Sequence, residues 1–262
     1  MAGRSVIPVA LLGLGTVGGG VYELFQRQKD QFFPKAGAIP MITRILVRDM
    51  KKPRPGVDPS LLTDRWEEIV GDPEIRIVIE VTGGIEPART RILEALAAGK
   101  NVITANKDLM AEHGAELFAA AEKSGCDLLF EASVAGGIPI IRPMKQCLAG
   151  NNISEVMGIV NGTTNYILTR MSRDGMSFSD ALKKAQELGY AEADPTADVE
   201  GTDAARKLAI LSSIAFHSRV VLGDVHVEGI SKITARDVAY ARELGCCVKL
   251  LAVARSDGES IE

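Results

Sequence analysis

The chain has 262 residues, of which 46% are hydrophobic and 24% are charged, and its formal net charge is −4. This composition is typical of a folded globular protein and excludes an intrinsically disordered chain. A net negative charge disfavours nucleic acid and anionic membranes as partners, because both attract basic surfaces. The length is sufficient for two domains of ordinary size.

The amino terminus lacks a long apolar segment, since residues 1–5 lead directly into an apolar run of only strand length. We therefore expect no signal peptide and no membrane anchor, and a cytoplasmic location. The four cysteines, Cys126, Cys147, Cys246 and Cys247, form no Cys-x-x-Cys pair. We expect them to be reduced thiols, most of them buried.

Strand-like and helix-like segments alternate over the first half of the chain. The predicted strands span 6–12, 42–47, 75–81, 101–104 and 127–131, and the predicted helices span 16–31, 87–98 and 111–124. This alternation predicts a parallel sheet with helices on both faces.

The regular alternation ends near residue 132, and the remaining sequence predicts a mixed α+β domain. A helix is expected to open at 136–139, with further helices near 163–174, 178–188 and 200–217 and strand-like segments at 153–160, 225–227 and 248–254. We place the domain boundary near residue 140. The first domain, 1–140, is predicted to bind a dinucleotide, and the second, 141–262, to bind substrate.

A glycine-rich loop follows the first predicted strand and fits the pattern G-x-G-x-x-G. In such loops the first glycine permits a tight turn, the second lets a pyrophosphate approach the backbone, and the third lets helix and strand pack closely. A glycine cluster alone can be a plain turn, but the strand before it and the helix after it favour dinucleotide binding and a Rossmann-type doubly wound sheet. The loop consists of Gly13, Leu14, Gly15, Thr16, Val17 and Gly18.

The end of the second predicted strand indicates which dinucleotide is bound. A carboxylate at this place binds the free ribose 2′-hydroxyl of NAD, whereas a cation binds the 2′-phosphate of NADP. Arg48 and the basic residues after it favour NADP, but the neighbouring Asp49 leaves NAD open. A basic loop that only contacts solvent is the alternative interpretation.

Two further segments are rich in polar residues. Lys107 follows the fourth predicted strand, at the sheet edge where ligands of α/β proteins bind, although a lysine there can also be a surface charge. The stretch 189–208 is acidic and runs into a helix on which Asp203 and Lys207 are four residues apart and share a face. This pair is either a solvated surface ion pair or a proton-transfer pair, and the acidic stretch suits the ammonium group of an amino-acid substrate.

Five motifs in this order resemble those of homoserine dehydrogenases across essentially the whole chain. They are the glycine loop at 13–18, Thr-Ala-Asn-Lys at 104–107, Glu-Ala-Ser-Val-Ala-Gly-Gly-Ile-Pro at 131–139, Asn-Gly-Thr-Thr-Asn-Tyr at 161–166, and the acidic stretch at 189–208. The resemblance implies an NAD(P)-dependent oxidoreductase that interconverts L-aspartate 4-semialdehyde and L-homoserine in threonine and methionine biosynthesis.

The resemblance also implies roles for individual residues. Lys207 corresponds to the catalytic lysine that exchanges a proton with the substrate oxygen, Asp203 to a carboxylate that orients the substrate, and Lys107 to a lysine beside nicotinamide and substrate. The remaining correspondences are Glu192 and Asp198 for the amino-acid end of the substrate, Thr82 for the cofactor, and Glu131, Val134, Gly136 and Ile138 for a monovalent cation such as sodium, held largely through backbone carbonyls.

Members of this family are usually longer, and many carry an additional ACT domain that senses threonine. We therefore expect this chain to be truncated at its carboxyl end, without the end of the catalytic domain or an ACT domain. An incomplete sheet leaves an exposed edge, and the family pairs its subunits through the second domain, so we expect a homodimer. Two alternatives stay open: a reductase of another amino-acid-derived aldehyde, and a non-catalytic fragment that only binds a dinucleotide.

Overall fold

The computed structural model describes residues 5–262, and the chain divides into two compact units, one ending at Gly137 and the other beginning at Ile138. No helix within the described residues is long and apolar enough to cross a membrane. The expectation of a leaderless amino terminus rests partly on residues 1–4, which lie outside the described part.

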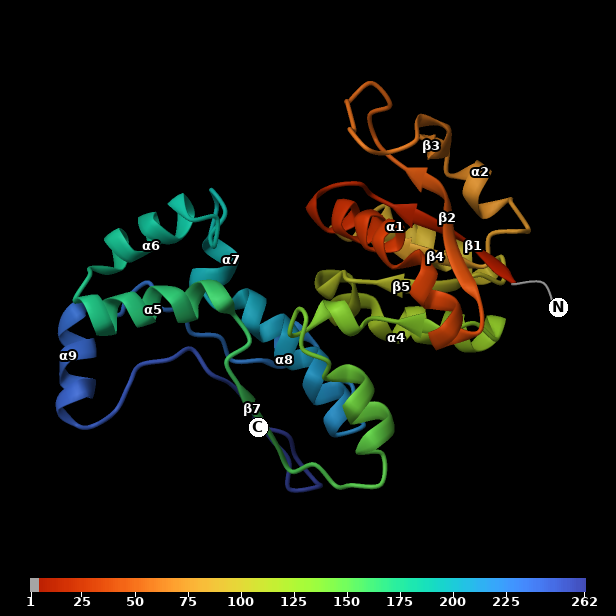
Figure 1. Cartoon of the computed structure of the whole chain (residues 1–262). Helices are drawn as coiled ribbons and strands as arrows, with labels where there is room; N and C mark the ends of the chain where they lie inside the picture. The colour runs from red at the N-terminus through yellow and green to blue at the C-terminus, as the bar shows by residue number, and fades with distance from the viewer. Residues whose placement is uncertain (1–4) are drawn as a thin grey trace. The chain divides into compact units, whose positions relative to one another are not determined.

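The first unit is built on a six-stranded parallel sheet (Figure 1). The strand order is β3-β2-β1-β4-β5-β6, so the chain winds outward from β1 in one direction and from β4 in the other. This reversal is the topological switch point of a Rossmann-type sheet, and it confirms the predicted fold class of the first half. The strands are β1 (Val6–Leu12), β2 (Ile39–Leu46), β3 (Leu62–Thr63), β4 (Ile77–Glu80), β5 (Asn101–Thr104) and β6 (Leu128–Leu129).

Helices connect the strands of the first unit, and local signals set their ends. Asn106 accepts a hydrogen bond from the Leu109 N–H at 3.1 Å and caps the helix α4. This helix therefore begins at Lys107, four residues before the start of the predicted helix 111–124. Gly125 ends that helix in the left-handed conformation, with φ of 63°. The elements are α1 (Thr16–Ala36), η1 (Pro59–Leu61), α2 (Glu67–Val70), α3 (Ala88–Ala97), α4 (Lys107–Ser124) and η2 (Glu131–Ser133).

The centre of the first unit is the buried strand β1. Its residues Val9, Ala10, Leu11 and Leu12 are all 0% exposed, as expected for a strand that is covered on both faces of a parallel sheet. The continuous apolar run in the sequence therefore correctly predicted the central strand.

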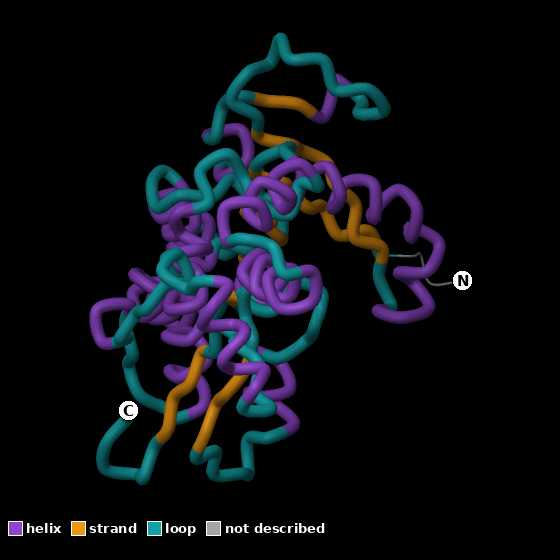
Figure 2. The backbone as a smooth tube through the Cα atoms, turned by 90° about the vertical axis from the view of Figure 1, so that its left-hand side faces the viewer, coloured by secondary structure: helices purple, strands orange, loops and turns teal. Residues whose placement is uncertain are grey.

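The second unit combines a two-stranded antiparallel ladder with five α-helices among its described residues; the strands are orange and the helices purple in Figure 2. Helix α8 packs against the ladder, and its Leu208 joins an apolar cluster with Ala252 and Ala254. The elements are η3 (Pro143–Cys147), β7 (Glu155–Gly158), α5 (Gly162–Asp174), α6 (Phe178–Glu187), α7 (Thr196–Val199), α8 (Thr202–Ala215), η4 (Leu222–Asp224), α9 (Ala235–Glu243) and β8 (Ala252–Arg255).

Several local predictions for the second half are wrong. No helix opens at 136–139, because Ala135 and Gly136 adopt left-handed φ angles of 61° and 57°. Helical structure begins only at residue 141 and continues into η3. The segment 225–227 forms no strand. Helix α9 was not predicted, although Thr234 and Asp237 form the reciprocal capping box that starts it.

The expectation of mostly buried cysteines is also wrong. All four cysteines are free thiols, but Cys147, Cys246 and Cys247 are exposed and only Cys126 is partly covered. Exposure follows from their places in η3 and in the connection after α9, where the backbone lies at the surface.

Substituting Gly18 should destabilise the first unit. A Cβ atom at this position would lie 2.1 Å from the Gly13 carbonyl oxygen, so strand and helix would have to move apart. We expect Gly18→Ala to lower the free energy of unfolding by about 1–3 kcal/mol, measured by urea denaturation. Gly20→Ala is the matched control in the same helix, because its Cβ would meet no atom within 4 Å. Equal stability of the two variants would show that the close approach at Gly18 is not needed.

Candidate active site

The glycine loop between β1 and α1 gives its three glycines three different surroundings. Gly13 has a φ of +95°, which an L side chain rarely adopts. Gly18 lies directly against the Gly13 carbonyl, whereas a Cβ at Gly15 would meet nothing within 4 Å. The loop thus has a tight turn, an open backbone surface and a close helix–strand contact. These are the features that a pyrophosphate at a helix N-terminus requires.

Thr82 lies beside this loop. It follows β4, which pairs with β1 at the switch point of the sheet. If Gly13 carried a Cβ atom, that atom would lie 3.1 Å from the Thr82 Cγ2 atom. The position inferred for Thr82 from the family resemblance, next to the cofactor loop, is therefore compatible with the fold.

A buried carboxylate that the sequence analysis missed holds this edge of the sheet. Glu80 ends β4, is 0% exposed, and accepts hydrogen bonds from the Thr82 N–H at 2.7 Å and the Thr82 hydroxyl at 2.6 Å. It also accepts from the Thr104 hydroxyl at 2.7 Å, at the end of the neighbouring β5. Glu80 thereby fixes the two loops that follow β4 and β5. The signal in the sequence that could have identified it is a glutamate directly after the apolar residues of β4.

Asn106 extends this network to the start of α4. Its N–H donates to the Thr104 hydroxyl at 3.0 Å, and its side-chain amide donates to the Gly84 carbonyl at 2.6 Å. Because the same side chain caps α4, Lys107 is the first residue of a helix whose start is tied to both loops. The sequence placed Lys107 at the carboxyl end of the sheet, and the structure does so too.

Arg48 is exposed and lies two residues beyond the end of β2. The neighbouring Asp49 uses one carboxylate oxygen to accept a hydrogen bond from the Lys51 N–H at 2.8 Å. Asp49 therefore stabilises a local turn. Arg48 lies one residue closer to the end of β2 than Asp49 does.

The positions inferred for a monovalent cation follow β6. Glu131 belongs to η2, Val134 is buried, and Gly136 lies in the left-handed turn that follows. Ile138 is the first residue of the second unit and is 69% exposed. Within residues 5–262 no cluster of three His, Cys, Asp or Glu side chains could hold a metal ion, so such a site would rest on carbonyl oxygens. The cation site stays a prediction.

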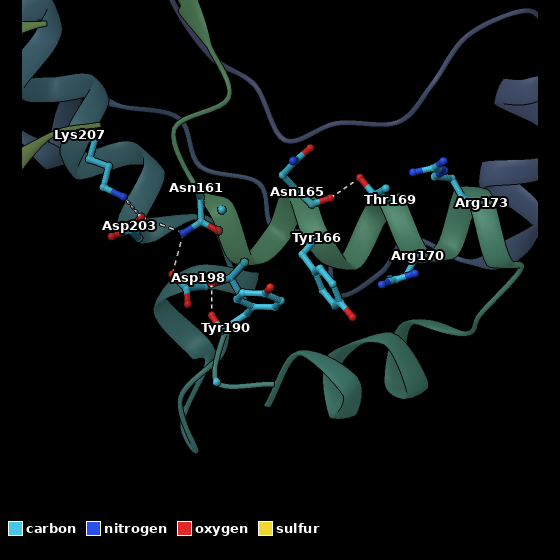
Figure 3. A pocket seen from close by; sticks show the side chains of 13 residues that line it. Asn161, Asn165, Tyr166, Thr169, Arg170, Arg173, Tyr190, Asp198, Asp203 and Lys207 are labelled. Atoms are coloured by element: carbon cyan, nitrogen blue, oxygen red, sulfur yellow. Dashed lines mark hydrogen bonds and ion pairs between the residues drawn. The ribbon is translucent and has the colours of Figure 1, made fainter. Parts of the chain in front are cut away.

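In the second unit Lys207 and Asp203 form an ion pair that is largely buried (Figure 3). The Lys207 Nζ atom lies 2.6 Å from Asp203 Oδ2, and the side chains are 18% and 8% exposed. Lys207 also donates to the Val160 carbonyl at 2.9 Å. The alternative of a solvated surface pair is therefore wrong. Since an ammonium group has three N–H donors, one is left over for a ligand.

Asn161 connects this pair to a second carboxylate (Figure 3). Its side-chain amide donates to Asp203 Oδ2 at 2.8 Å and to Asp198 Oδ1 at 2.7 Å. Asn161 lies in the motif at 161–166, but no individual role was predicted for it. The contacts join residues 37 and 42 positions apart, which no local pattern reveals.

The carboxylates of the acidic stretch at 189–208 have different surroundings in the structure. Asp194 accepts hydrogen bonds from the side chain and backbone of Thr196, which hold the pKa of its carboxyl below the usual value and fix a turn. Glu192 and Glu200 are exposed, and the Glu192 carbonyl accepts from Gln186 at 3.1 Å. Of the two residues expected to bind the amino-acid end of a substrate, the structure brings Asp198, but not the Glu192 side chain, to the lysine pair.

A cavity of about 730 Å³ adjoins this cluster. Carboxylates and Lys207 line one part of it, and two arginines of α5 line another, so charged side chains lie at both parts of the cavity (Figure 3). The side chains that the figure labels are Asn161, Asn165, Tyr166, Thr169, Arg170, Arg173, Tyr190, Asp198, Asp203 and Lys207.

Comparison with known proteins shows the family to which the chain belongs. Residues 13–131 match the family model of the homoserine dehydrogenase NAD-binding domain, and residues 139–261 match the homoserine dehydrogenase model. A solved putative homoserine dehydrogenase from Archaeoglobus fulgidus is 35% identical, with a TM-score of 0.84 over 98% of this chain and 82% of that one. The chain belongs to the homoserine dehydrogenase family.

Other homoserine dehydrogenases are more similar in sequence but considerably longer. The crystal structure from Thiobacillus denitrificans is 48% identical, with a TM-score of 0.93, and the match covers 99% of this chain and 60% of that one. The enzyme from Bacillus subtilis is also 48% identical, over 98% of this chain and 59% of its own length. The chain thus spans somewhat more than half the length of such relatives. The family assignment and the nicotinamide-dinucleotide-binding fold expected from the sequence are confirmed.

Proposed function

We propose that the chain carries homoserine dehydrogenase activity, the NAD(P)-dependent interconversion of L-aspartate 4-semialdehyde and L-homoserine. The observation that supports it most is the buried Lys207–Asp203 pair beside a cavity that a second carboxylate, Asp198, also lines. An ammonium donor suits an aldehyde oxygen, and a nearby carboxylate suits the ammonium group of an amino acid. The glycine loop of the first unit would hold the dinucleotide.

When bound by the glycine loop, the nicotinamide dinucleotide would supply the hydride that the carbonyl carbon accepts in aldehyde reduction. Lys207 donates a proton from Nζ to the carbonyl oxygen, so that the C=O group becomes CH–OH, and the neutral lysine regains a proton from solvent. Asp203 orients the Lys207 ammonium group through their ion pair. In the reverse direction Lys207 accepts the hydroxyl proton. From the family resemblance, Lys107 would border nicotinamide and substrate, Asp198 and Glu192 would bind the amino-acid end, and a sodium ion would bind at 131–138.

The activity is tested by following NADP reduction by L-homoserine at mildly alkaline pH. Lys207→Ala should lower kcat by at least about 100-fold, because it removes the general acid and base, while cofactor affinity stays unchanged. Lys183→Ala, at an exposed lysine of α6, is the control and should keep the wild-type rate. Retention of more than a few per cent of the rate by Lys207→Ala would exclude the lysine as the main proton donor. Cofactor binding without any turnover by the wild-type chain would favour the non-catalytic fragment instead.

For the cofactor we propose a preference for NADP over NAD, on the basis of Arg48. Arg48→Ala should weaken NADPH binding about 10-fold or more, since it removes a charge-assisted contact to the 2′-phosphate. NADH binding should hardly change. Fluorescence titration of both cofactors measures the difference, and Lys123→Ala, at an exposed lysine of α4, is the control. Wild-type protein that binds NAD as tightly as NADP would refute the preference.

We further propose that the chain forms a homodimer through the outer face of the β7–β8 ladder, in the cytoplasm. Met157 pairs with Val253 on the face opposite the apolar cluster of α8, and Met157 and Leu251 are 53% and 51% exposed. Such an exposed apolar face on a two-stranded ladder is typical of an interface.

Light scattering tests the dimer. The wild-type mass should be twice that of one 27.9 kDa chain, and Met157→Glu should give the monomer mass because it buries an unpaired charge. Leu244→Glu, at a side chain that is 80% exposed in the connection after α9, is the control and should stay dimeric. A monomeric wild-type chain at working concentration would refute this assembly.

A further inference from the structure

Asn161 uses both ends of its side-chain amide. It is the N-cap of α5 and is 5% exposed. Its Oδ1 atom accepts from the Thr164 N–H at 2.8 Å and from the Thr164 hydroxyl at 2.9 Å. Its Nδ2 atom donates to Asp198 and to Asp203. An amide has two donors and two acceptor sites, so this side chain has no capacity left for another partner.

The orientation of the amide follows from chemistry. A backbone N–H can only donate, so the atom that faces Thr164 has to be the oxygen. The nitrogen therefore faces the two aspartates, which have to present lone pairs to it. The same oxygen of Asp203 also accepts from Lys207. One continuous chain of hydrogen bonds runs from Lys207 through Asp203 and Asn161 to Asp198.

The amide does not titrate, and this property separates the two carboxylates that it joins. Asp203 contacts the proposed proton donor, and Asp198 is the proposed partner of the substrate ammonium group. If a carboxyl group stood between them, it would share a proton with one or both of them. The neutral amide of Asn161 donates one hydrogen bond to each carboxylate, and it does not transfer a proton from one carboxylate to the other.

We propose that Asn161 is a positioning residue that keeps Asp198 and Asp203 both ionised and keeps their proton exchange separate, so that the mobile proton stays on Lys207. This inference rests on the proposed dehydrogenase function and adds to it the residue that organises the site. Asn161 acts on the reaction through the two carboxylates.

Asn161→Asp tests the proposal, because the substitution is nearly isosteric. Aspartate still caps α5 by accepting from the Thr164 N–H, but its second oxygen faces two carboxylates and requires a shared proton. The ratio of wild-type to variant kcat/KM for L-homoserine oxidation should therefore increase at least about tenfold from about pH 6 to about pH 9, as that proton is lost. A ratio that stays constant with pH would overturn the proposal.

Two further variants separate this effect from helix capping. Ser177→Ala removes the cap of α6 far from the carboxylates in sequence; it should lower the thermal midpoint but leave kcat/KM unchanged. Asn161→Ser keeps a capping oxygen but is too short to reach the aspartates. It should lower kcat/KM by a factor that does not depend on pH. Equal, pH-dependent losses in Asn161→Ser and Asn161→Asp would overturn the role of the amide.

A measurement without turnover distinguishes failure of this proposal from failure of the proposed function. In the wild-type chain, without substrate or cofactor, NMR should show that the Asn161 side-chain NH₂ exchanges hydrogen at least about tenfold more slowly than that of the exposed Asn152. Its resonances should move when Asp198 or Asp203 is changed to asparagine. Slow exchange in a chain that does not oxidise homoserine would support the network and count against the activity. Exchange as fast as that of Asn152 would overturn the proposal, whether or not the chain is active.

Discussion

Burying a carboxylate is costly unless hydrogen-bond donors surround it, and each unit of this protein is organised around one such group. In the first unit Glu80 is fully buried and is satisfied by hydroxyl and backbone donors from the loop after β4 and from the end of β5. In the second unit Asp203 is satisfied by Lys207 and Asn161. The described donors to Glu80 are all neutral and fix the backbone around it, whereas Asp203 has a cationic donor, Lys207, to which the proposed function assigns proton exchange.

The elements that could be predicted from the sequence are those set by local signals. The apolar run of β1 and the glycines after it lie within one short segment, so composition and spacing are sufficient to predict strand, turn and helix. Helix α9 also has a local signal, the Thr234–Asp237 capping box, which the periodicity of apolar residues does not reveal. The segment 225–227 has apolar residues in alternation, but among the described residues β7 and β8 pair only with each other, so this segment forms no ladder.

The candidate site could be predicted only in part, because long-range contacts decide which polar residues belong to it. Five carboxylates of the acidic stretch have the same local appearance. Asp198 and Asp203 become part of the site because Asn161, from the start of α5, reaches both of them, while Asp194 is used by its own turn. Glu80 was missed for the same reason, since its partner Thr104 lies on another strand. Spacing along one helix did predict the Lys207–Asp203 contact, but not its burial.

In the proposed dehydrogenase function the two buried carboxylates would have different tasks. Hydride transfer would require a fixed backbone surface for the dinucleotide, and the hydrogen bonds of Glu80 and Asn106 fix the loops at that edge. In the proposed function proton transfer would use the donor Lys207, which lies next to the carboxylate of Asp203. The amide of Asn161 is suited to the boundary between that pair and Asp198 because it binds both anions and cannot release a proton to either. A site that moves one proton needs such neutral groups around its donor as much as it needs the donor itself.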